Sequence, residues 1–305
     1  MILVMGELEE PMIEDVLNEL ERRGAPVRFI SAQEMPGEVS LSVALPGTGS
    51  CLRWSDGTTL PLEKVRSIYH RLGFSSFQGL QDYSAAEDAF VSSECMGALT
   101  PVLNALPAQG TRVVNPPLAS GTNASKPYQT SLIQEIGFSI PETLVTNDAE
   151  AAVEFFDRHE GQVIYKSISY VRSIVKQMTA EDLQRLDTLQ TCPIQLQEMV
   201  AGIDYRVHVI GDQVFAHKIL ASDADYRYDK QAQITAYELE PATRQRCIQV
   251  ARRLGMEIAG VDLRRTPAGQ AYCFEVNPSP AFSWYEVRTG QPITESLCDL
   301  LLQPL

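Results

Sequence analysis

The segment GVDLRRTPAGQAYCFEVNPSP at residues 260–280 constrains the fold more than any other part of the sequence. Strand-like apolar runs at 258–263 and 271–276 flank a turn that contains Pro267 and Gly269, so the segment predicts an antiparallel β-hairpin. Two prolines directly after the second run would end that strand, because proline cannot donate to a sheet ladder. They also predict a rigid loop where the hairpin ends.

Three oxygen-bearing side chains are expected on one face of this hairpin. Alternation along the strand directs Glu275 and Asn277 to the same side, and Asp262 on the partner strand can face the same way. Carboxylate and amide oxygens suit Mg²⁺, which also keeps water ligands and bridges to substrate phosphates. The alternative is that Asp262 is a turn residue and Glu275 a solvated acid at a sheet edge. Glu275 follows the apolar run 272–274, where an unpaired carboxylate would be costly, and this favours metal ligation.

The composition limits the classes of protein to which the chain can belong. At 305 residues, with 44% hydrophobic and 21% charged side chains, it is long enough for two or three globular lobes. A net charge of −14 without a basic stripe disfavours nucleic acid as a partner, because phosphates would be repelled. The six cysteines lie far apart without a CxxC pair, which argues against zinc and disulfide frameworks.

The start of the chain and its apolar runs bear on location. No run approaches the roughly 20 apolar residues that a membrane helix needs, so no membrane partner is expected. The opening segment 1–17 has a short apolar start, no basic flank and acidic residues directly after it, which argues against a signal peptide. We therefore expect a cytoplasmic protein.

Local patterns predict a chain of mixed α/β and α+β class with three lobes. The first lobe, 1–115, opens with a strand–helix–strand unit and ends in the turn-rich run 110–127. An α+β lobe at 116–192 follows, and then an antiparallel lobe at 193–305 that contains the hairpin. The other strands are expected at 1–5, 27–30, 65–71 (at a sheet edge), 140–146, 161–169, 174–178, 194–200, 205–210 and 214–220, and the helices at 10–23, 85–106, 126–136, 149–159, 180–189, 241–254 and 293–302.

Two lysines stand where phosphates could bind. Lys166 lies near the end of the strand-like run 161–169, where a lysine is either an ordinary surface residue or a point charge facing a nucleotide cleft. Lys126 stands at an expected helix start, where a cation opposes the helix dipole unless an anion lies nearby. The phosphates of ATP would supply that anion.

The segment PIQLQEMVAGIDYRVHVIG at 193–211 combines an acid-bearing strand, a short connector and a second strand. Alternation puts Asp204, Arg206 and His208 on one face of the second strand. The main chain at 198–200 could hydrogen-bond adenine, Asp204 could meet ribose hydroxyls, and Arg206 could meet phosphate or acyl-phosphate oxygens. The alternative is an ordinary amphipathic hairpin with a solvated polar face.

Taken in order, these segments resemble the ATP-grasp superfamily, and more narrowly its RimK-like carboxylate–amine ligases and the related graspetide (microviridin-type) peptide ligases. The resemblance is specific over roughly 115–290 and implies a nucleotide between the central and C-terminal lobes, with ATP and Mg²⁺ as cofactors and Mn²⁺ as the alternative ion. The positions that match the family are the phosphate lysines Lys126 and Lys166, the adenine hinge Glu198, Met199 and Val200, the D-x-R pair Asp204 and Arg206, and the metal ligands Asp262, Glu275 and Asn277.

Two segments depart from the family pattern. The run KSISYVRSIVKQM after the second lysine lacks the glycine-rich flap that covers phosphates, so Ser167, Ser169 or Ser173 would have to donate instead. The segment YHRLGF at 69–74 matches only part of the arginine-bearing segment of graspetide ligases. The ending NPSPAFSWYE at 277–286 does resemble their asparagine–proline segment and aromatic tail.

The resemblance implies a ligase that activates a carboxylate as an acylphosphate and joins it to an amine, with Lys166 and Arg206 in catalytic positions. The expected substrate is a peptide or small molecule that carries both groups, with peptides and amino acids preferred. The loop 221–233, with Tyr226 and Arg227, and the segment around Arg71 would line the acceptor side. The rival interpretations are an ATP-grasp kinase and a nucleotide-binding regulatory protein. A homodimer fits ligases of this kind, although no sequence feature establishes one.

Overall fold

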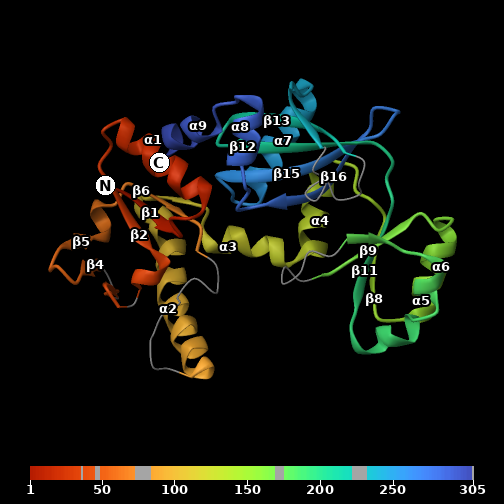
Figure 1. The fold of residues 1–305 in the computed structure, drawn as a ribbon, viewed down its shortest axis with the longest axis horizontal. Helices are drawn as coiled ribbons and strands as arrows, with labels where there is room; N and C mark the ends of the chain where they lie inside the picture. The colour runs from red at the N-terminus through yellow and green to blue at the C-terminus, as the bar shows by residue number, and fades with distance from the viewer. Residues whose placement is uncertain (36, 45–48, 73–83, 169–174, 222–231, 304–305) are drawn as a thin grey trace.

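Three lobes lie along the long axis of the molecule, and the lobe that comes last in the sequence lies between the other two (Figure 1). The computed structural model describes residues 1–35, 37–44, 49–72, 84–168, 175–221 and 232–303. Each lobe has a β-sheet of its own, and a small fourth sheet extends the N-terminal lobe. No helix within these described ranges is long and apolar enough to cross a membrane.

A parallel sheet in the order β2-β1-β6-β7 forms the N-terminal lobe. Its strands are β1 (Ile2–Gly6), β2 (Val27–Ser31), β6 (Ser67–His70) and β7 (Arg112–Val114). The predicted edge position of the strand at 65–71 is wrong, because β6 pairs with β1 on one side and β7 on the other. The chain crosses over through a long helix and adds β7 on the outer side of β6, which buries Ser67, Ile68 and Tyr69.

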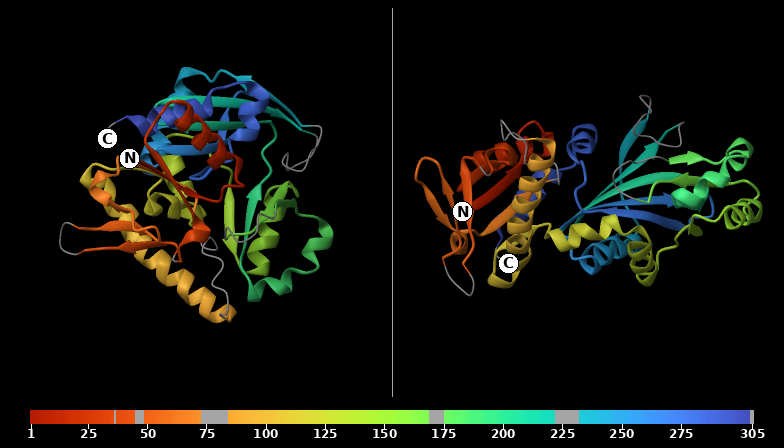
Figure 2. Two further views of the ribbon diagram at one scale, coloured as in Figure 1. Left: turned by 60° about the vertical axis from the view of Figure 1, so that its left-hand side comes forward. Right: turned by 90° about the horizontal axis from the view of Figure 1, so that it is seen from below.

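Helices and a small antiparallel sheet complete this lobe. The strand–helix–strand opening is confirmed by α1, whose buried face carries Ile13, Val16 and Leu20 against the sheet. The longest helix, α2, extends beyond the body of the lobe (Figures 1 and 2). The elements are α1 (Pro11–Arg22), β3 (Val39–Ser42), β4 (Cys51–Trp54), β5 (Thr59–Pro61) and α2 (Ala85–Ala105). The helices α3 (Pro117–Ser120) and α4 (Lys126–Glu135) come next in the sequence.

An antiparallel sheet in the order β10-β9-β11-β8 forms the central lobe. Its elements are β8 (Thr143–Thr146), α5 (Ala149–Arg158), β9 (Val163–Lys166), β10 (Val175–Gln177), α6 (Ala180–Leu183) and β11 (Ile194–Glu198). The single helix predicted at 180–189 is wrong, because α6 ends at Leu183 and a 3₁₀-helix follows at Leu186–Thr191. Strand β11 pairs with β8 and β9, so the central sheet continues past residue 192.

The C-terminal lobe has five strands in the order β14-β13-β12-β15-β16. Its elements are β12 (Ile203–Ile210), β13 (Gln213–Leu220), β14 (Gln233–Tyr237), α7 (Pro241–Arg253), β15 (Ile258–Arg265), β16 (Ala271–Asn277), α8 (Ser283–Thr289) and α9 (Ile293–Leu302). Both predicted hairpins, β12–β13 and β15–β16, are confirmed. The sequence patterns did not predict β14 or α8.

The two faces of the C-terminal sheet differ in chemistry. On the apolar face, Val207 and Val261 pack with Leu132 and Ile133 of α4 and with Val250 of α7, and full burial of such side chains contributes about 1.5–3 kcal/mol each. Figure 2 shows α4 and α7 on the same side of the sheet. Helix α4 therefore packs with the C-terminal lobe, although it precedes the central sheet in the sequence. The opposite face is left for polar side chains and α8.

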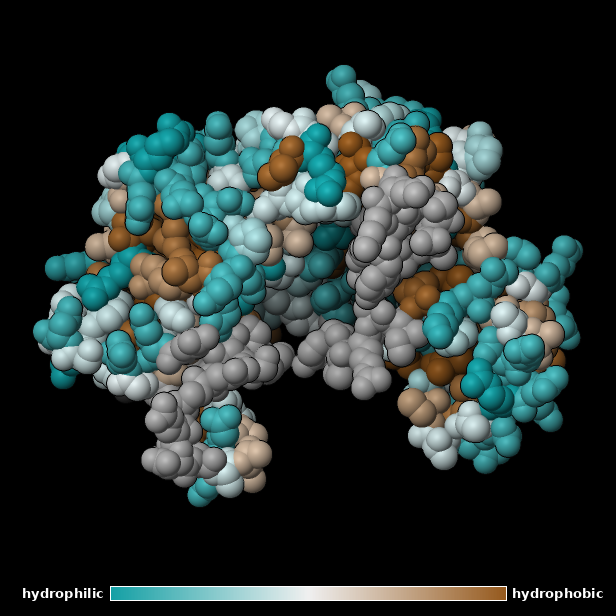
Figure 3. Space-filling model, in the orientation of Figure 1, coloured by the Kyte–Doolittle hydropathy of each residue, from teal (hydrophilic) through white to brown (hydrophobic). Residues whose placement is uncertain are grey.

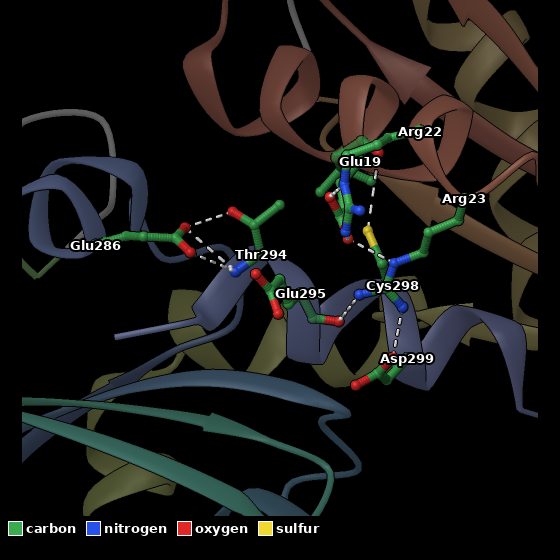
Figure 4. Close-up of polar contacts among 9 residues, drawn as sticks. Glu19, Arg22, Arg23, Glu286, Thr294, Glu295, Cys298 and Asp299 are labelled. Carbon is green, nitrogen blue, oxygen red and sulfur yellow. Dashed lines mark hydrogen bonds and ion pairs between the residues drawn. The ribbon is translucent and has the colours of Figure 1, made fainter. Parts of the chain in front are cut away.

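The first and last helices fasten the N-terminal lobe to the C-terminal lobe (Figure 4). Arg23, directly after α1, pairs with Asp299 of α9 and donates to the Glu295 carbonyl at 3.2 Å. Glu286 of α8 accepts from the Thr294 main-chain nitrogen at 3.1 Å and so caps the first turn of α9. These contacts hold the N-terminal and C-terminal lobes together on either side of the loop that follows β16.

Asn115, directly after β7, is a second connection between the same two lobes. Its amide nitrogen donates to the carbonyls of Ile258 and Pro278 at 2.7 and 2.6 Å. Its amide oxygen accepts from the main-chain nitrogens of Glu257 and Ile258 at 2.7 and 3.1 Å. One buried side chain thus fixes both the start of β15 and the loop after β16.

Alanine at position 115 is expected to lower the free energy of unfolding by about 3 kcal/mol, because four main-chain hydrogen bonds of Asn115 are lost inside the protein. Urea unfolding followed by circular dichroism would measure the change. Asn104→Ala is the matched control, since Asn104 accepts one exposed bond from Leu118, and its loss should stay below about 1 kcal/mol. Equal losses for the two variants would contradict this role for Asn115.

Candidate active site

The acidic hairpin brings two carboxylates directly opposite each other. Asp262 of β15 pairs with Glu275 of β16, and Gly260 pairs with Asn277 one step further along. The register shifts after Asp262, because Leu263 pairs with Cys273 and Phe274 is left as an extra residue in β16, whereas the pairing of β15 with β12 stays regular. Like charges at opposed positions repel, and an arrangement of this kind requires positive charge nearby.

Two cations contact the acidic pair. Arg206 Nη1 of β12 donates to Asp262 Oδ1 at 2.7 Å, and Lys126 Nζ of α4 lies 3.2 Å from Glu275 Oε2. Burial raises the pKa of Asp262 above its ordinary value; the Arg206 guanidinium opposes the rise and the Glu275 charge adds to it. The two acids are therefore only partly neutralised by protein side chains.

Lys166 approaches the same acids from the central lobe. It is 9% exposed, and burial lowers its pKa to about 8, with the positive charge of Lys126 acting in the same direction and the charges of Glu275 and Asp262 opposing it. These interactions bring Lys126, Lys166 and the acidic pair into one cluster. In Figure 3 this face of the molecule is hollowed near its centre, and hydrophilic residues line the depth of the hollow.

A glycine makes room for the arginine of the site. A Cβ added to Gly260 would lie 2.4 Å from Arg206 Nη2 and 2.7 Å from Pro280 Cβ, far inside van der Waals contact. The Arg206 side chain is almost fully buried, so it has little room to move aside. The guanidinium thus packs against the bare Cα of Gly260 and donates to Asp262.

The donor set of the hairpin fits Mg²⁺. The two carboxylates and the Asn277 amide supply hard oxygen ligands, and the side chains of Asp262 and Glu275 remain 36% and 26% exposed, which leaves room for water ligands. Asn277 Oδ1 accepts from the Ser279 main-chain nitrogen at 2.8 Å, which fixes the amide at the start of the proline-containing loop. A divalent cation would also relieve the repulsion between the opposed acids.

The predicted adenine hinge links the central and C-terminal sheets. The main-chain nitrogens of Glu198 and Met199 donate to the carbonyls of Glu142 and Gln162, both at 2.9 Å. Within the described residues the Val200 main-chain nitrogen has no such main-chain partner, so it is the hinge nitrogen left to meet a ligand. The Glu198 side chain lies near His159, with 3.9 Å between the carboxylate and Nδ1.

Sequence reasoning missed two residues that hold the predicted ones. Arg264 forms a bidentate pair with Asp204, the residue predicted to meet ribose, and alternation could have found it two positions after Asp262. Gln129 of α4 accepts from the Val276 nitrogen at 2.9 Å and donates to the Val276 carbonyl at 2.8 Å. No sequence signal marks Gln129, because a polar residue on a helix normally faces solvent.

Part of the predicted acceptor side, including Arg71, lies within the described residues, and so does Trp284 of the aromatic tail. Arg71 pairs with Glu10 and donates to the Pro280 carbonyl at 3.2 Å, so its guanidinium braces the loop after β16. Trp284 of α8 is stacked by Arg288 at 4.1 Å and stays partly exposed. Tyr226 and Arg227 of the predicted acceptor side lie outside the described residues, as does Phe74 at the end of the segment 69–74. So do Ser169 and Ser173, two of the serines predicted as phosphate donors.

A pair of buried histidines lies behind Arg206. His208 Nδ1 and His217 Nε2 are 3.1 Å apart, and both rings pack against Tyr285 of α8. Both side chains are fully buried, so neither ring can act as a general base on a bound substrate. Burial, and then the positive charge of Arg206, lowers the pKa of His217 to about 4, and that of His208 also falls well below its usual range.

Because both histidines are neutral in the folded protein, we expect the free energy of unfolding to fall on acidification. Between pH 6.5 and 4 the unfolded chain binds a proton at His217 that the folded protein refuses, so stability falls with pH by up to about 3 kcal/mol. Urea unfolding at pH 7, 5.5 and 4.5 would measure the slope. His217→Gln is expected to flatten it. A slope identical in wild type and His217→Gln would refute the prediction.

A family model described as the RimK-like ATP-grasp domain matches residues 124–301. The match takes in the Lys126 and Lys166 positions, the hinge and the whole acidic hairpin. It therefore spans all of the cluster described above.

Curated relatives carry ligase names. The probable alpha-L-glutamate ligase of Pseudoalteromonas translucida (strain TAC 125) is 32% identical over 114 residues, which are 35% of this chain and 38% of that protein. The probable alpha-L-glutamate ligase 2 of Shewanella frigidimarina (strain NCIMB 400) is 25% identical over 209 residues, 64% of this chain and 70% of that protein. The chain thus spans little more than a third of the length of the first relative.

Solved structures match almost the entire chain. The ATP-grasp ligase PsnB, complexed with a phosphomimetic variant of a minimal precursor, Mg and ADP, has a TM-score of 0.84 at 28% identity, covering 99% of this chain and 97% of that one. The macrocyclase MdnC from Microcystis aeruginosa MRC, bound with the precursor peptide MdnA, has a TM-score of 0.85 at 21% identity, covering 99% and 100%. The second likeness shows the fold alone.

Proposed function

Because the chain belongs to the RimK-like ATP-grasp family, we propose that it is an ATP-dependent ligase that joins a carboxylate to an amine. One observation carries the proposal: Lys126, from the helix α4 that packs on the C-terminal sheet, and Lys166, from the central sheet, both face a pair of opposed carboxylates, with 3.2 Å between Lys126 Nζ and Glu275 Oε2. A structural ion-pair network has no need of two acids directly opposite each other or of a buried second lysine. A metal-bound triphosphate would satisfy both groups.

The nucleotide would lie between the central and C-terminal lobes. The Val200 nitrogen would donate to adenine, with the Glu198 carbonyl as the matching acceptor, and Asp204 would accept from ribose hydroxyls. Lys126 and Lys166 would offset the charge of the phosphates. As divisions of the sequence we propose 1–115, 116–192 and 193–305. Helix α4 of the second segment packs on the C-terminal sheet, and β11 of the third segment pairs within the central sheet and leads into the hinge.

Positioning and charge neutralisation supply the catalysis. Mg²⁺, when bound, contributes a doubly positive charge beside the phosphates, and Asp262, Glu275 and Asn277 would hold it, with Mn²⁺ as the alternative ion. Arg206 and Lys166 would stabilise the charge that develops during transfer. A substrate carboxylate attacks the γ-phosphorus, the bond to the bridging oxygen breaks and ADP leaves. The amine nitrogen then attacks the acyl carbon, phosphate leaves, and solvent takes the amine proton.

For the substrate we favour a peptide, because PsnB is known in complex with the precursor peptide PsnA2 and has 28% identity to this chain. An amino acid is the second choice, supported by relatives named as glutamate ligases. A homodimer fits ligases of this kind, and size-exclusion chromatography would test for one.

The test is ADP release across pools of peptides, amino acids and amines, followed by mass spectrometry of the product. Hydroxylamine should trap the acylphosphate as a hydroxamate, whereas a kinase would yield a stable phosphate ester and no hydroxamate. ADP release that requires a second substrate would exclude a purely regulatory nucleotide-binding protein. Product phosphorylated but not ligated would overturn the proposal in favour of the kinase.

A further inference from the structure

Arg264 makes three charge-assisted contacts at the junction of the central and C-terminal lobes. Its Nε and Nη2 donate to the Asp204 carboxylate at 2.6 and 2.8 Å, and its Nη1 donates to the Val200 carbonyl at 2.9 Å. A bidentate guanidinium–carboxylate pair fixes angle as well as distance, which a lysine cannot do. The contacts join the hinge to the first residues of β12.

The surroundings of Arg264 leave it little freedom. Asp204 is its direct partner across the β12–β15 ladder, and the Phe274 ring lies 5.4 Å from its guanidinium carbon. A Cβ added to Gly202 would lie 3.0 Å from Arg264 Cγ and 2.3 Å from the Arg265 carbonyl oxygen, so the connector after the hinge runs directly against β15. The path of the connector and the orientation of Arg264 therefore depend on each other.

We propose that Arg264 is a positioning residue for the nucleotide. It holds the adenine hinge and Asp204 in a fixed relation to each other and leaves Asp204 able to accept from a ribose hydroxyl. The inference rests on the proposed ATP site. Each carboxylate oxygen of Asp204 has two acceptor positions, and Arg264 occupies one on each. Arg264 acts through Asp204 and Val200 and does not itself touch the nucleotide.

The same strand connects this unit to the phosphate side of the site. Arg264 and Asp262 are two residues apart on β15 and so face the same side, about 6.6 Å apart along the strand. The distance between the ribose acceptor and the candidate metal ligand is therefore set by one strand. A shift of Arg264 would alter the spacing that a nucleotide has to match.

Arg264→Lys tests the proposal through binding of ATP, 2′-deoxy-ATP and 3′-deoxy-ATP in the presence of Mg²⁺, measured by calorimetry. Wild type should prefer ATP over at least one deoxynucleotide by about tenfold, the size expected for a hydrogen bond to a charged acceptor. In Arg264→Lys the Kd for ATP should rise about tenfold and the preference should fall close to one. At saturating ATP, kcat should change by less than about threefold, because the reacting groups are untouched.

Arg265→Lys is the matched control on the neighbouring position. Arg265 faces the other side of β15, where it pairs with Glu240 and donates to the Tyr237 hydroxyl at 3.2 Å. This variant should keep both the affinity and the ribose preference of wild type. Asp204→Asn, a second variant, should lose the ribose preference as Arg264→Lys does, which keeps the test open if one variant folds poorly.

The outcomes separate this inference from the proposed function. Failure of wild type to bind ATP would overturn the ligase proposal and this inference together. ATP binding with no preference over either deoxynucleotide, or a preference that Arg264→Lys retains in full, would overturn the role of Arg264 alone. A melting temperature of Arg264→Lys close to that of Arg265→Lys would show that the binding change is not a consequence of unfolding.

Discussion

Glutamine in place of Glu275 is expected to slow ADP release by about 10²–10³-fold, the effect of removing one group that organises charge in a phosphoryl-transfer site. The substitution keeps the shape of the side chain and removes the negative charge that faces Lys126 at 3.2 Å and Asp262 across the ladder. It should also raise the Mg²⁺ concentration needed for half-maximal rate. Steady-state ADP release over a Mg²⁺ titration would measure both quantities.

The surface pair of Glu135 and Arg253 supplies the control. Its nitrogen and oxygen are also 3.2 Å apart, but both side chains are about half exposed, so Glu135→Gln should leave the rate and the Mg²⁺ dependence unchanged. If Glu275→Gln keeps full activity with wild-type Mg²⁺ dependence, the acidic hairpin is not the catalytic metal site.

Alanine at position 260 is expected to lower kcat by about 100-fold although it adds a single methyl group. The new Cβ would lie 2.6 Å from Arg206 Cζ and 2.7 Å from Pro280 Cβ, so the guanidinium has to leave its place opposite Asp262. A displacement of about 1 Å in a catalytic group costs on the order of 100-fold in rate. Overpacking should also cost about 1–3 kcal/mol of stability.

A double-mutant cycle would establish the cause of the loss. If Gly260→Ala acts through Arg206, then adding Arg206→Ala to it should lower kcat little further, because the arginine has already been displaced. Gly97→Ala is the control for a glycine-to-alanine change, since Gly97 lies in α2 with open space around it. Fully additive effects of Gly260→Ala and Arg206→Ala would refute the steric explanation.

The sequence predicted which side chains come together better than it predicted the contacts that hold them in place. Alternation along β12, β15 and β16 places Arg206, Asp262 and Glu275 correctly on one face, because a period of two is a local property of a strand. The contacts of Arg264 with Asp204 and of Gln129 with Val276 depend on which strands and helices become neighbours. The periodicity within one strand or helix carries no information about its neighbours.

The errors in the fold have the same origin. The pattern of β6 describes a strand with a polar end, and that end lies at the lobe junction, where His70 Nε2 is 2.6 Å from the Asn115 carbonyl oxygen. The residues of β6 alone do not indicate that β7 pairs with it on the other side. The 3₁₀-helix after α6 likewise carries an apolar spacing close to that of an α-helix, and its two buried leucines, Leu186 and Leu189, are three residues apart.

Because α4 packs on the C-terminal sheet, the two lysines of the site belong to different parts of the structure: Lys126 is fixed to the C-terminal lobe and Lys166 to the central lobe. Gln129 ties the helix of Lys126 to the strand of Glu275, so these two residues keep their spacing whatever the central lobe does. Lys166 belongs to the central sheet, and the positive charge of Lys126 disfavours its own. A polyanion bound between them would turn that repulsion into attraction on both sides, and arrival of the triphosphate would itself draw the central lobe inward.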